Sequence, residues 1–506
     1  MKKLYNVVMK SNIYRSAAQV TIFSTVEKGL SFLYRIVLSR TIGAEGLGIY
    51  QICLTVFAVF LTAASSGVPV TVSRLMAKST ASNDMKGKHS AVTAGIICTL
   101  VITVPVAIIL FFGRNAFGFL FSDKRCIDIF IILLPGLVLT AIYSVIRGSF
   151  WGNKQFLPYS VIELLEDAVM VICGVILCLG APDPVTGAKF AVIAVLISYV
   201  FSFAVSIGWY LTSGGKFANP KQQLKPLIAS SAPVTAMRTS ASLLNSAVAF
   251  LLPALLIAGG ASNSEAMSLF GIVAGMAIPI LMMPSSAIGS IAVVVAPELS
   301  ENYYRGNSVA VRKDIEKAVG AAIFIAVMIV PFLFVLGGAI SEFLYSSKMC
   351  GEIVIYSSFI VLPMCISMMT NTVLNSMNCE KQTMIYFMIG AAATLLCIGA
   401  LTPLIGVYSY VCGLACSTLI SAVLNLRLLK KKCERINILK YILKGTVVVL
   451  FACLFGWLLN GILKRFVPPV AQIAVCAPVL LLFTAAAAYL LKLFTFRPLK
   501  RLVSKE

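Results

Sequence analysis

Fourteen long apolar segments, separated by short polar ones, run through the 506 residues of the chain. A bilayer core of about 30 Å needs roughly 20 apolar residues per helix, and a helix pairs its backbone polar groups internally. Hydrophobic residues make up 59% of the chain and charged residues only 12%. We therefore predict an all-α integral membrane protein with 14 transmembrane helices, near residues 13–40, 47–77, 89–113, 127–151, 158–180, 188–212, 227–259, 266–302, 315–338, 353–378, 382–403, 407–429, 439–463 and 469–495.

The formal charge of +22 is explained by the topology of a membrane protein. With a cytoplasmic N-terminus, the cytoplasmic segments hold roughly thirty of the Lys and Arg residues and the outer segments about eight, as the positive-inside rule requires. We expect a multi-pass protein of the cell membrane with both termini in the cytoplasm. The basic charge is explained by membrane topology, so no nucleic-acid partner is expected.

The chain also contains an internal repeat. Ser149, Lys154 and Gln155 in the turn RGSFWGNKQFLP recur, at one constant offset, as Ser376, Lys381 and Gln382 in LNSMNCEKQ. Two groups of six helices have the same topology, because six spans return the chain to the same side, and a pseudo-twofold axis along the membrane normal would relate them. We predict an N-terminal six-helix lobe at 1–226, a C-terminal six-helix lobe at 227–430 and two additional transmembrane helices at 431–506.

Polar residues form a stripe on the first helix of each half, at a spacing of three or four residues that places them on one helical face. A single shift along the chain superposes one stripe on the other, with Thr21 on Thr235. Packing explains some of the hydroxyl groups, since small residues let membrane helices approach closely, and Arg35 could alternatively extend toward the outer surface. Buried cations, however, indicate a net positive cavity for an anionic substrate. The predicted substrate-binding residues are Lys28, Arg35, Arg238, Thr21, Ser24, Ser31, Thr235, Ser242 and Asn245.

A second set of charged residues is assigned to coupling or gating: Glu27, Arg147, Glu163, Glu166 and Asp167. Glu27 is either a proton or cation site or the partner of a basic group. The turn that contains Arg147 is expected at the cytoplasmic surface. Two interpretations of the three acids that follow it remain open, because they could interact with the positive end of their helix or form a latch with Arg147.

Nothing in the sequence favours an enzyme. We find no glycine-rich phosphate loop and no nucleophile constellation, and the 14 cysteines show no metal-site or disulfide spacing. No cofactor and no metal are expected. A membrane glycan polymerase remains an alternative, although the outer loops are short and poor in acids.

Three stretches carry a family resemblance: YRIVLSRTIGAEGLGIYQ, SGVPVTVSRLMA and RGSFWGNKQFLPYSVIELLED. They resemble the stage V sporulation protein B group of the polysaccharide transporter family. This family belongs to the multidrug/oligosaccharidyl-lipid/polysaccharide flippase superfamily, which includes the lipid II flippases. The resemblance implies two six-helix lobes around a central cavity, with basic residues of the first and seventh helices contacting a pyrophosphate.

The function expected from these features is translocation, by alternating access, of a lipid-linked saccharide of the undecaprenyl-pyrophosphate type or of a peptidoglycan precursor, in sporulation. Its partners would be this substrate and the membrane lipids, with coupling to a monovalent cation or to the membrane potential. The alternative within the superfamily is a cation-coupled multidrug exporter.

Overall fold

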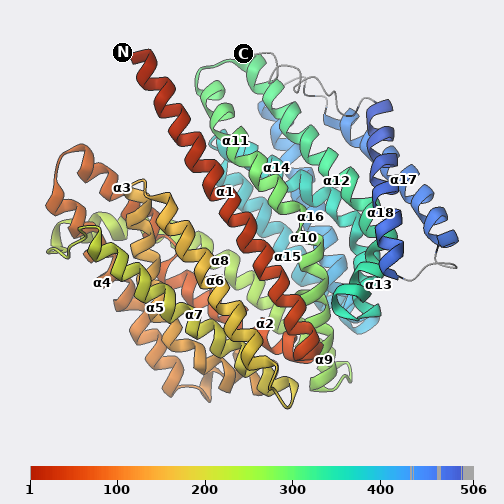
Figure 1. Cartoon of the computed structure of the whole chain (residues 1–506), viewed down its shortest axis with the longest axis horizontal. Helices are drawn as coiled ribbons and strands as arrows, with labels where there is room; N and C mark the ends of the chain where they lie inside the picture. The colour runs from red at the N-terminus through yellow and green to blue at the C-terminus, as the bar shows by residue number, and fades with distance from the viewer. Residues whose placement is uncertain (1, 434–435, 437, 464–468, 492, 494–506) are drawn as a thin grey trace. The chain divides into compact units, whose positions relative to one another are not determined.

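The computed structural model describes residues 2–433, 436, 438–463, 469–491 and 493, and within them every regular element is a helix (Figure 1). The chain forms two compact units, Met1–Gly271 and Ile272–Glu506. The first contains α1 (Lys2–Thr41), α2 (Gly43–Ser65), α3 (Val68–Ala81), α4 (Met85–Phe112), η1 (Ala116–Leu120), α5 (Arg125–Gly152), α6 (Phe156–Cys178), α7 (Pro184–Thr212), α8 (Lys221–Ala258) and α9 (Asn263–Phe270).

A short π-helix, η2 (Gly271–Ala277), follows α9. The second unit then contains α10 (Ile278–Met282), α11 (Pro284–Tyr304), α12 (Ser308–Tyr345), α13 (Lys348–Ser357), η3 (Ser358–Ile360), α14 (Val361–Ser376), α15 (Glu380–Ile405), α16 (Tyr408–Lys432), α17 (Ile438–Leu463) and α18 (Pro469–Leu490).

In the part of the chain that the structure describes, 12 helical segments are long and apolar enough to cross a membrane. They correspond to 12 of the predicted spans, so the all-helical membrane class is confirmed. The other two predicted spans, 13–40 and 158–180, are helical as α1 and α6. Both helices carry charged residues within their apolar stretch, such as Glu27 and Lys28 in α1 and three acids in α6. The total of 14 spans stays a prediction.

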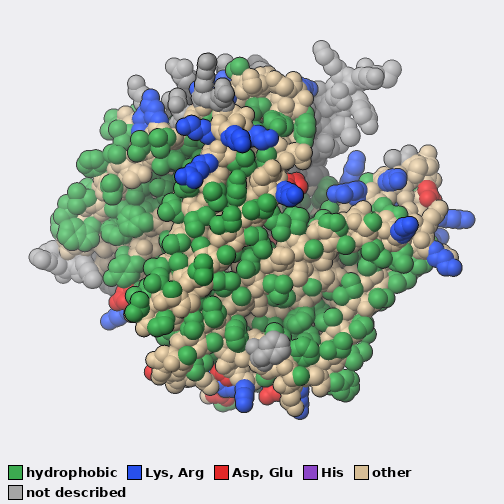
Figure 2. Space-filling model, turned by 180° about the vertical axis from the view of Figure 1, so that it is seen from behind, with side chains coloured by type: hydrophobic (Ala, Val, Ile, Leu, Met, Phe, Trp, Pro, Cys, Tyr) green, Lys and Arg blue, Asp and Glu red, His purple; other side chains and the backbone are tan. Residues whose placement is uncertain are grey.

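Apolar side chains cover most of the visible surface, and Lys and Arg gather toward the upper and lower margins of the view (Figure 2). Phe112 and Leu396, for example, are 81% and 74% exposed. Such exposure is costly in water but is expected of side chains that face lipid.

The two copies of the repeated turn have the same backbone geometry. Lys154 and Asn378 both have positive φ, 60° and 61°. The next N–H in each turn donates to the carbonyl five residues earlier, Gln155 to Phe150 at 2.8 Å and Cys379 to Leu374 at 3.0 Å. This is the Schellman motif that closes a helix. The backbone therefore pairs Lys154 with Asn378, whereas the sequence identities pair it with Lys381.

Other helices begin in the same structural register. Corresponding helices of the two halves start at positions separated by the same number of residues as Lys154 and Asn378, to within one position. This holds for the pairs α4/α12, α5/α13, α6/α15 and α7/α16. The caps repeat as well: Asp84 accepts a hydrogen bond from the Gly87 N–H at 2.8 Å, and Asn307 accepts one from Ala310 at 3.1 Å. From α4 and α12 onward, the paired helices of the two halves therefore begin at equivalent positions.

The compact units do not end where the repeat does. α8 spans the predicted boundary at residue 226, and all of it belongs to the first unit, where it packs against α2, α3 and α4. α17 and α18, the predicted appended pair, pack against α12 within the second unit. The division of the chain into lobes of 1–226, 227–430 and 431–506 stays a prediction.

α5 is central in the first unit, where it packs against α2, α3, α4 and α7. Its Ile146 and Phe150 are 0% and 1% exposed and lie in an apolar cluster with Val72 of α3. This packing fixes the rotation of α5 about its axis. One polar face of α5 is thereby directed into the interior of the unit.

Candidate functional site

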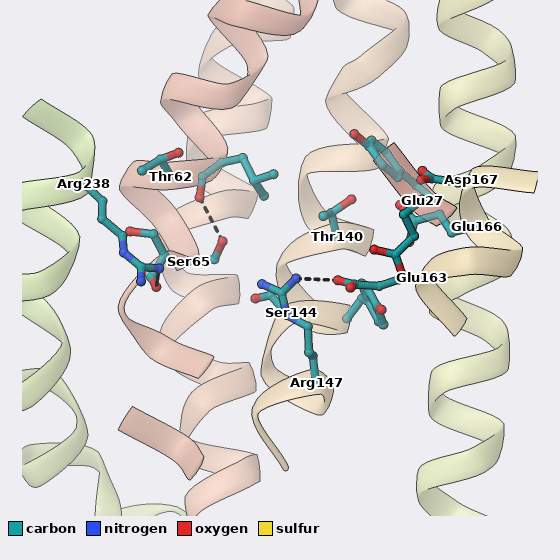
Figure 3. Close-up of a pocket in the computed structure, with 14 residues that line it drawn as sticks. Glu27, Thr62, Ser65, Thr140, Ser144, Arg147, Glu163, Glu166, Asp167 and Arg238 are labelled. Atoms are coloured by element: carbon teal, nitrogen blue, oxygen red, sulfur yellow. Dashed lines mark hydrogen bonds and ion pairs between the residues drawn. The ribbon is translucent and has the colours of Figure 1, made fainter. Parts of the chain in front are cut away.

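A cavity of about 430 Å³ lies within the first unit, between α1, α2, α5, α6, α7 and α8 (Figure 3). Its volume falls in the range of roughly 300–1,000 Å³ that is typical of ligand sites. The ionisable residues that line it are Glu27, Arg147, Glu163, Glu166, Asp167 and Arg238. Most of the other lining residues carry hydroxyl groups: Thr62, Ser65, Ser66, Thr140, Tyr143, Ser144 and Tyr199.

Helical periodicity explains why these side chains meet. Thr140, Tyr143, Ser144 and Arg147 occur at i, i+3, i+4 and i+7 on α5, which is one face of a helix. The acids 163, 166 and 167 occur at i, i+3 and i+4 on α6. The polar faces of two neighbouring helices therefore meet in the same cavity.

Arg147 and Glu163 join α5 to α6. The Nη1 atom of Arg147 donates to Oε1 of Glu163 at 2.9 Å, and the two side chains are 30% and 22% exposed. The guanidinium also lies 5.2 Å from the Trp151 ring centroid and 6.0 Å from that of Tyr159. A cation this close to aromatic rings is stabilised by their π electrons as well as by the carboxylate.

This geometry changes two expectations from the sequence. Arg147 lies within α5 and lines the cavity, so placing it in a surface turn was wrong. The first turn of α6 contains no acidic residue, and the helix begins at Phe156, well before Glu163. The acids are therefore too far along the helix for the capping interpretation, whereas the Arg147–acid contact is present. Whether that contact acts as a latch stays a prediction.

Three further carboxyl groups face the cavity without an ion pair among the described side chains: Glu27, Glu166 and Asp167. Asp167 accepts a hydrogen bond from the Ser31 hydroxyl of α1 at 3.4 Å. With Glu163, the lining carries four carboxyl groups and two guanidinium groups. From the sequence we expected a net positive lining, because we assigned Lys28 of α1 to substrate binding and its neighbour Glu27 to coupling or gating.

Arg238 of α8 lies on the opposite wall from these acids (Figure 3). Its Nη1 atom donates to the carbonyl of Ser66, where α2 gives way to α3, at 3.0 Å. One turn earlier, the Thr235 hydroxyl accepts from the Gly67 N–H at 3.1 Å. A Cβ atom at Gly67 would collide with the Ser231 carbonyl, so the glycine is what lets α8 approach this closely.

Most of the predicted substrate-binding residues lie outside this cavity. Of the nine, only Arg238 lines it, whereas all five predicted coupling or gating residues do. Lys28 is exposed, and Arg35 donates to Oε1 of Gln51 at 3.2 Å. Ser24 donates to the Thr21 carbonyl at 3.2 Å, within its own helix. Ser242 is half-buried and Asn245 is exposed on α8.

Sequence reasoning missed the hydroxyl groups of α5. The spacing of Thr140, Tyr143, Ser144 and Arg147 is a stripe like those on α1 and α8, so the signal was present in the sequence. Oγ1 of Thr140 and the Tyr143 hydroxyl have no hydrogen-bond partner among the described residues, and neither does the Ser66 hydroxyl. Enclosed polar atoms without partners cost roughly 1–3 kcal/mol each, so a ligand that formed hydrogen bonds with these groups would recover that cost.

Residues 13–303 match the family described as polysaccharide biosynthesis protein. Over 500 residues the chain is 25% identical to stage V sporulation protein B of Bacillus subtilis (strain 168), and the match covers 94% of each chain. It is 21% identical over 418 residues to lipid II flippase MurJ of the same organism, covering 76% of this chain and 77% of that one.

A solved structure shares the fold. It is the inward-facing conformation of a multidrug resistance MATE family transporter of the MOP superfamily, with a TM-score of 0.68 and 16% identity. The match covers 81% of this chain and 95% of the transporter. The resemblance predicted from the three quoted stretches is confirmed. The chain belongs to the polysaccharide biosynthesis protein family.

Proposed function

We propose that the protein is a flippase, which moves a lipid-linked saccharide of the undecaprenyl-pyrophosphate type across the cytoplasmic membrane by alternating access, in sporulation. The observation that carries this proposal is a cavity of about 430 Å³, lined by ionisable and hydroxyl groups, inside a bundle whose surface is apolar. Family membership and the name of the relative lipid II flippase MurJ support this class of substrate, and the name of stage V sporulation protein B supports the role in sporulation.

A saccharide headgroup cannot cross hydrocarbon unaided, because each unpaired hydroxyl or phosphate oxygen loses its hydrogen bonds to water. The cavity offers hydroxyl groups for sugar oxygens and one guanidinium, that of Arg238, for a phosphate. A guanidinium has five N–H donors and binds phosphate in a bidentate manner. One donor contacts the Ser66 carbonyl, which holds the side chain at the cavity wall and leaves other donors for the substrate.

The predicted topology indicates the side of the membrane from which the headgroup would enter the cavity. The turn after α5 is predicted to face the cytoplasm, and Arg147 lies five residues before the end of α5. At 1.5 Å per residue, the cavity begins about 7–8 Å inside that end. We propose that the headgroup enters from this side, and that the Arg147–Glu163 pair opens and closes the entrance.

Reconstitution tests this function. Liposomes that contain the purified protein, and a fluorescent polyprenyl-pyrophosphate saccharide in one leaflet, should expose the probe in the opposite leaflet faster than protein-free liposomes do. A membrane-impermeant quencher measures the exposed fraction. Equal rates with and without protein would rule out the proposal, provided that the reconstituted protein keeps its helical circular dichroism spectrum.

One observation favours a second candidate. The cluster of Glu27, Glu166 and Asp167 is suited to bind a proton or a monovalent cation, as a cation-coupled exporter requires. Imposed Na⁺ or H⁺ gradients separate the two functions. An exporter would accumulate a cationic drug against its own gradient, whereas the proposed flippase would move the lipid-linked saccharide and leave the drug distribution unchanged.

A further inference from the structure

The charges of the cavity are separated in space. Arg238 lies on one wall, whereas Glu27, Glu166 and Asp167 lie together on the other (Figure 3). Arg147 and Glu163 neutralise one another through their ion pair at 2.9 Å. What remains is one guanidinium facing three carboxyl groups, which gives the cavity a positive and a negative end.

A purely anionic headgroup fits only one end of this cavity. A pyrophosphate close to these three acids is disfavoured wherever the acids are ionised, because like charges repel strongly in a low-dielectric space. A headgroup that is anionic at one end and cationic at the other would interact favourably with Arg238 on one wall and with the three acids on the other. The ammonium would also supply the ion pair that the three acids lack among the described side chains.

A second feature of the acidic end indicates a ligand. Tyr143 is 4% exposed and lines the cavity, yet its hydroxyl has no hydrogen-bond partner in the described part of the chain. It is one turn from Arg147 on α5, on the same face as Thr140. A phenol can accept a hydrogen bond from an N–H donor, so this hydroxyl and the carboxylates can share an ammonium group.

We propose that the substrate is a lipid-linked saccharide whose headgroup carries a primary ammonium group in addition to its pyrophosphate. Arg238 binds the phosphate, and Glu27, Glu166 and Asp167 together with the Tyr143 hydroxyl bind the ammonium. This inference rests on the proposed flippase function for the lipid-linked nature of the substrate. The selection for an ammonium rests on the cavity alone.

Two probes that differ by one acetyl group test the inference. The first is a polyprenyl-pyrophosphate saccharide that carries one lysyl side chain, which is protonated at pH 7 because its pKa is near 10.4. The second is the same molecule acetylated at the lysyl Nε, which removes the charge. Affinity is measured for both probes with the purified full-length protein in detergent, and flux is measured in liposomes.

The wild type should bind the amine probe at least about tenfold more tightly than the acetylated probe, the size of effect expected for one charged hydrogen bond. Glu166→Gln should bring this ratio toward one. Because both probes are compared on the same variant, partial loss of folded protein cancels in the ratio. The control is Glu301→Gln, which removes an exposed acid outside the cavity and should keep the wild-type ratio.

The affinity measurement tests the ammonium site, and the flux measurement tests the flippase function. Equal affinity of the wild type for the two probes, or a ratio that Glu166→Gln leaves unchanged, would overturn the inference, and the acids would then serve another cation. If the affinities differ as expected but neither probe moves between leaflets, the flippase proposal fails and the ammonium site stands.

Discussion

The Arg147–Glu163 pair should contribute measurably to stability, and its partial burial sets the size of the effect. Exposed ion pairs contribute about 0.2–1 kcal/mol, whereas removing one partner of a fully buried pair costs about 3–5 kcal/mol. Here the side chains are 30% and 22% exposed. We therefore expect Glu163→Gln to lower the free energy of unfolding by about 1–3 kcal/mol, between these two cases.

A double-mutant cycle isolates the pair from its surroundings. The variants are Arg147→Met, Glu163→Gln and the combination of both, and reversible unfolding in mixed detergent micelles gives the free energy of each. The coupling energy should be about 1–2 kcal/mol. Part of the Arg147 contribution will remain in Glu163→Gln, because the guanidinium keeps its contacts with Trp151 and Tyr159.

The chain provides a matched control. Arg305 and Glu301 form an ion pair at 2.6 Å, closer than the cavity pair, but their side chains are 71% and 52% exposed. The same cycle on this pair should give a coupling energy of no more than about 0.5 kcal/mol. A coupling energy near zero at Arg147–Glu163, or one no larger than that of the control, would show that burial does not strengthen this ion pair.

Single contacts at Gly67, Tyr143 and Asp183 also have measurable consequences. Gly67→Ala should lower the free energy of unfolding by about 1–3 kcal/mol, because the added Cβ would meet the Ser231 carbonyl. The control is Gly29→Ala, which has open space around it and should not lower the free energy of unfolding. Thermal melts in detergent compare the two variants. Tyr143→Phe should raise the free energy of unfolding by about 1 kcal/mol in the absence of substrate, because it removes an enclosed hydroxyl without a partner, yet it should weaken binding of the amine probe. Hydrogen bonds from the Thr186 hydroxyl and from the N–H groups of Thr186 and Val185 hold the pKa of Asp183 below its ordinary value. The stabilisation by this cap should therefore be complete above about pH 4 and lost as the pH falls through the lowered pKa, and the melting temperature of Asp183→Ala should show a smaller change over that window.

Apolar patterning was sufficient to locate the helices. Each predicted span contains a helix, because a segment of that length in hydrocarbon has no other way to pair its backbone groups. Even α1 and α6 are helical, although each carries charged residues within its apolar stretch. The repeat was also detectable, but its register was not: the identities align Lys154 with Lys381, whereas the backbone geometry aligns it with Asn378.

The site was harder to predict than the fold. Helical periodicity shows which residues share a face, but not which neighbour that face meets. On α1, Glu27 and Lys28 are adjacent and so point about 100° apart, and it is Glu27 that lines the cavity. Because the rotation of a helix is fixed by packing with helices distant in sequence, the predicted cationic stripe contributed only Arg238 to the cavity, whereas the acids and Arg147 came together.

If this cavity carries the headgroup across the membrane, the rate of transport must depend on Arg238, which lines its wall. Arg238→Ala and the exposed control Arg305→Ala are reconstituted in equal amounts, and the rate at which the polyprenyl-pyrophosphate probe changes leaflet is measured for each. We expect Arg238→Ala to lower the rate at least about tenfold, because it removes one charged hydrogen bond to phosphate, while Arg305→Ala keeps the wild-type rate. Wild-type flux in folded Arg238→Ala protein would show that the headgroup does not cross through this cavity.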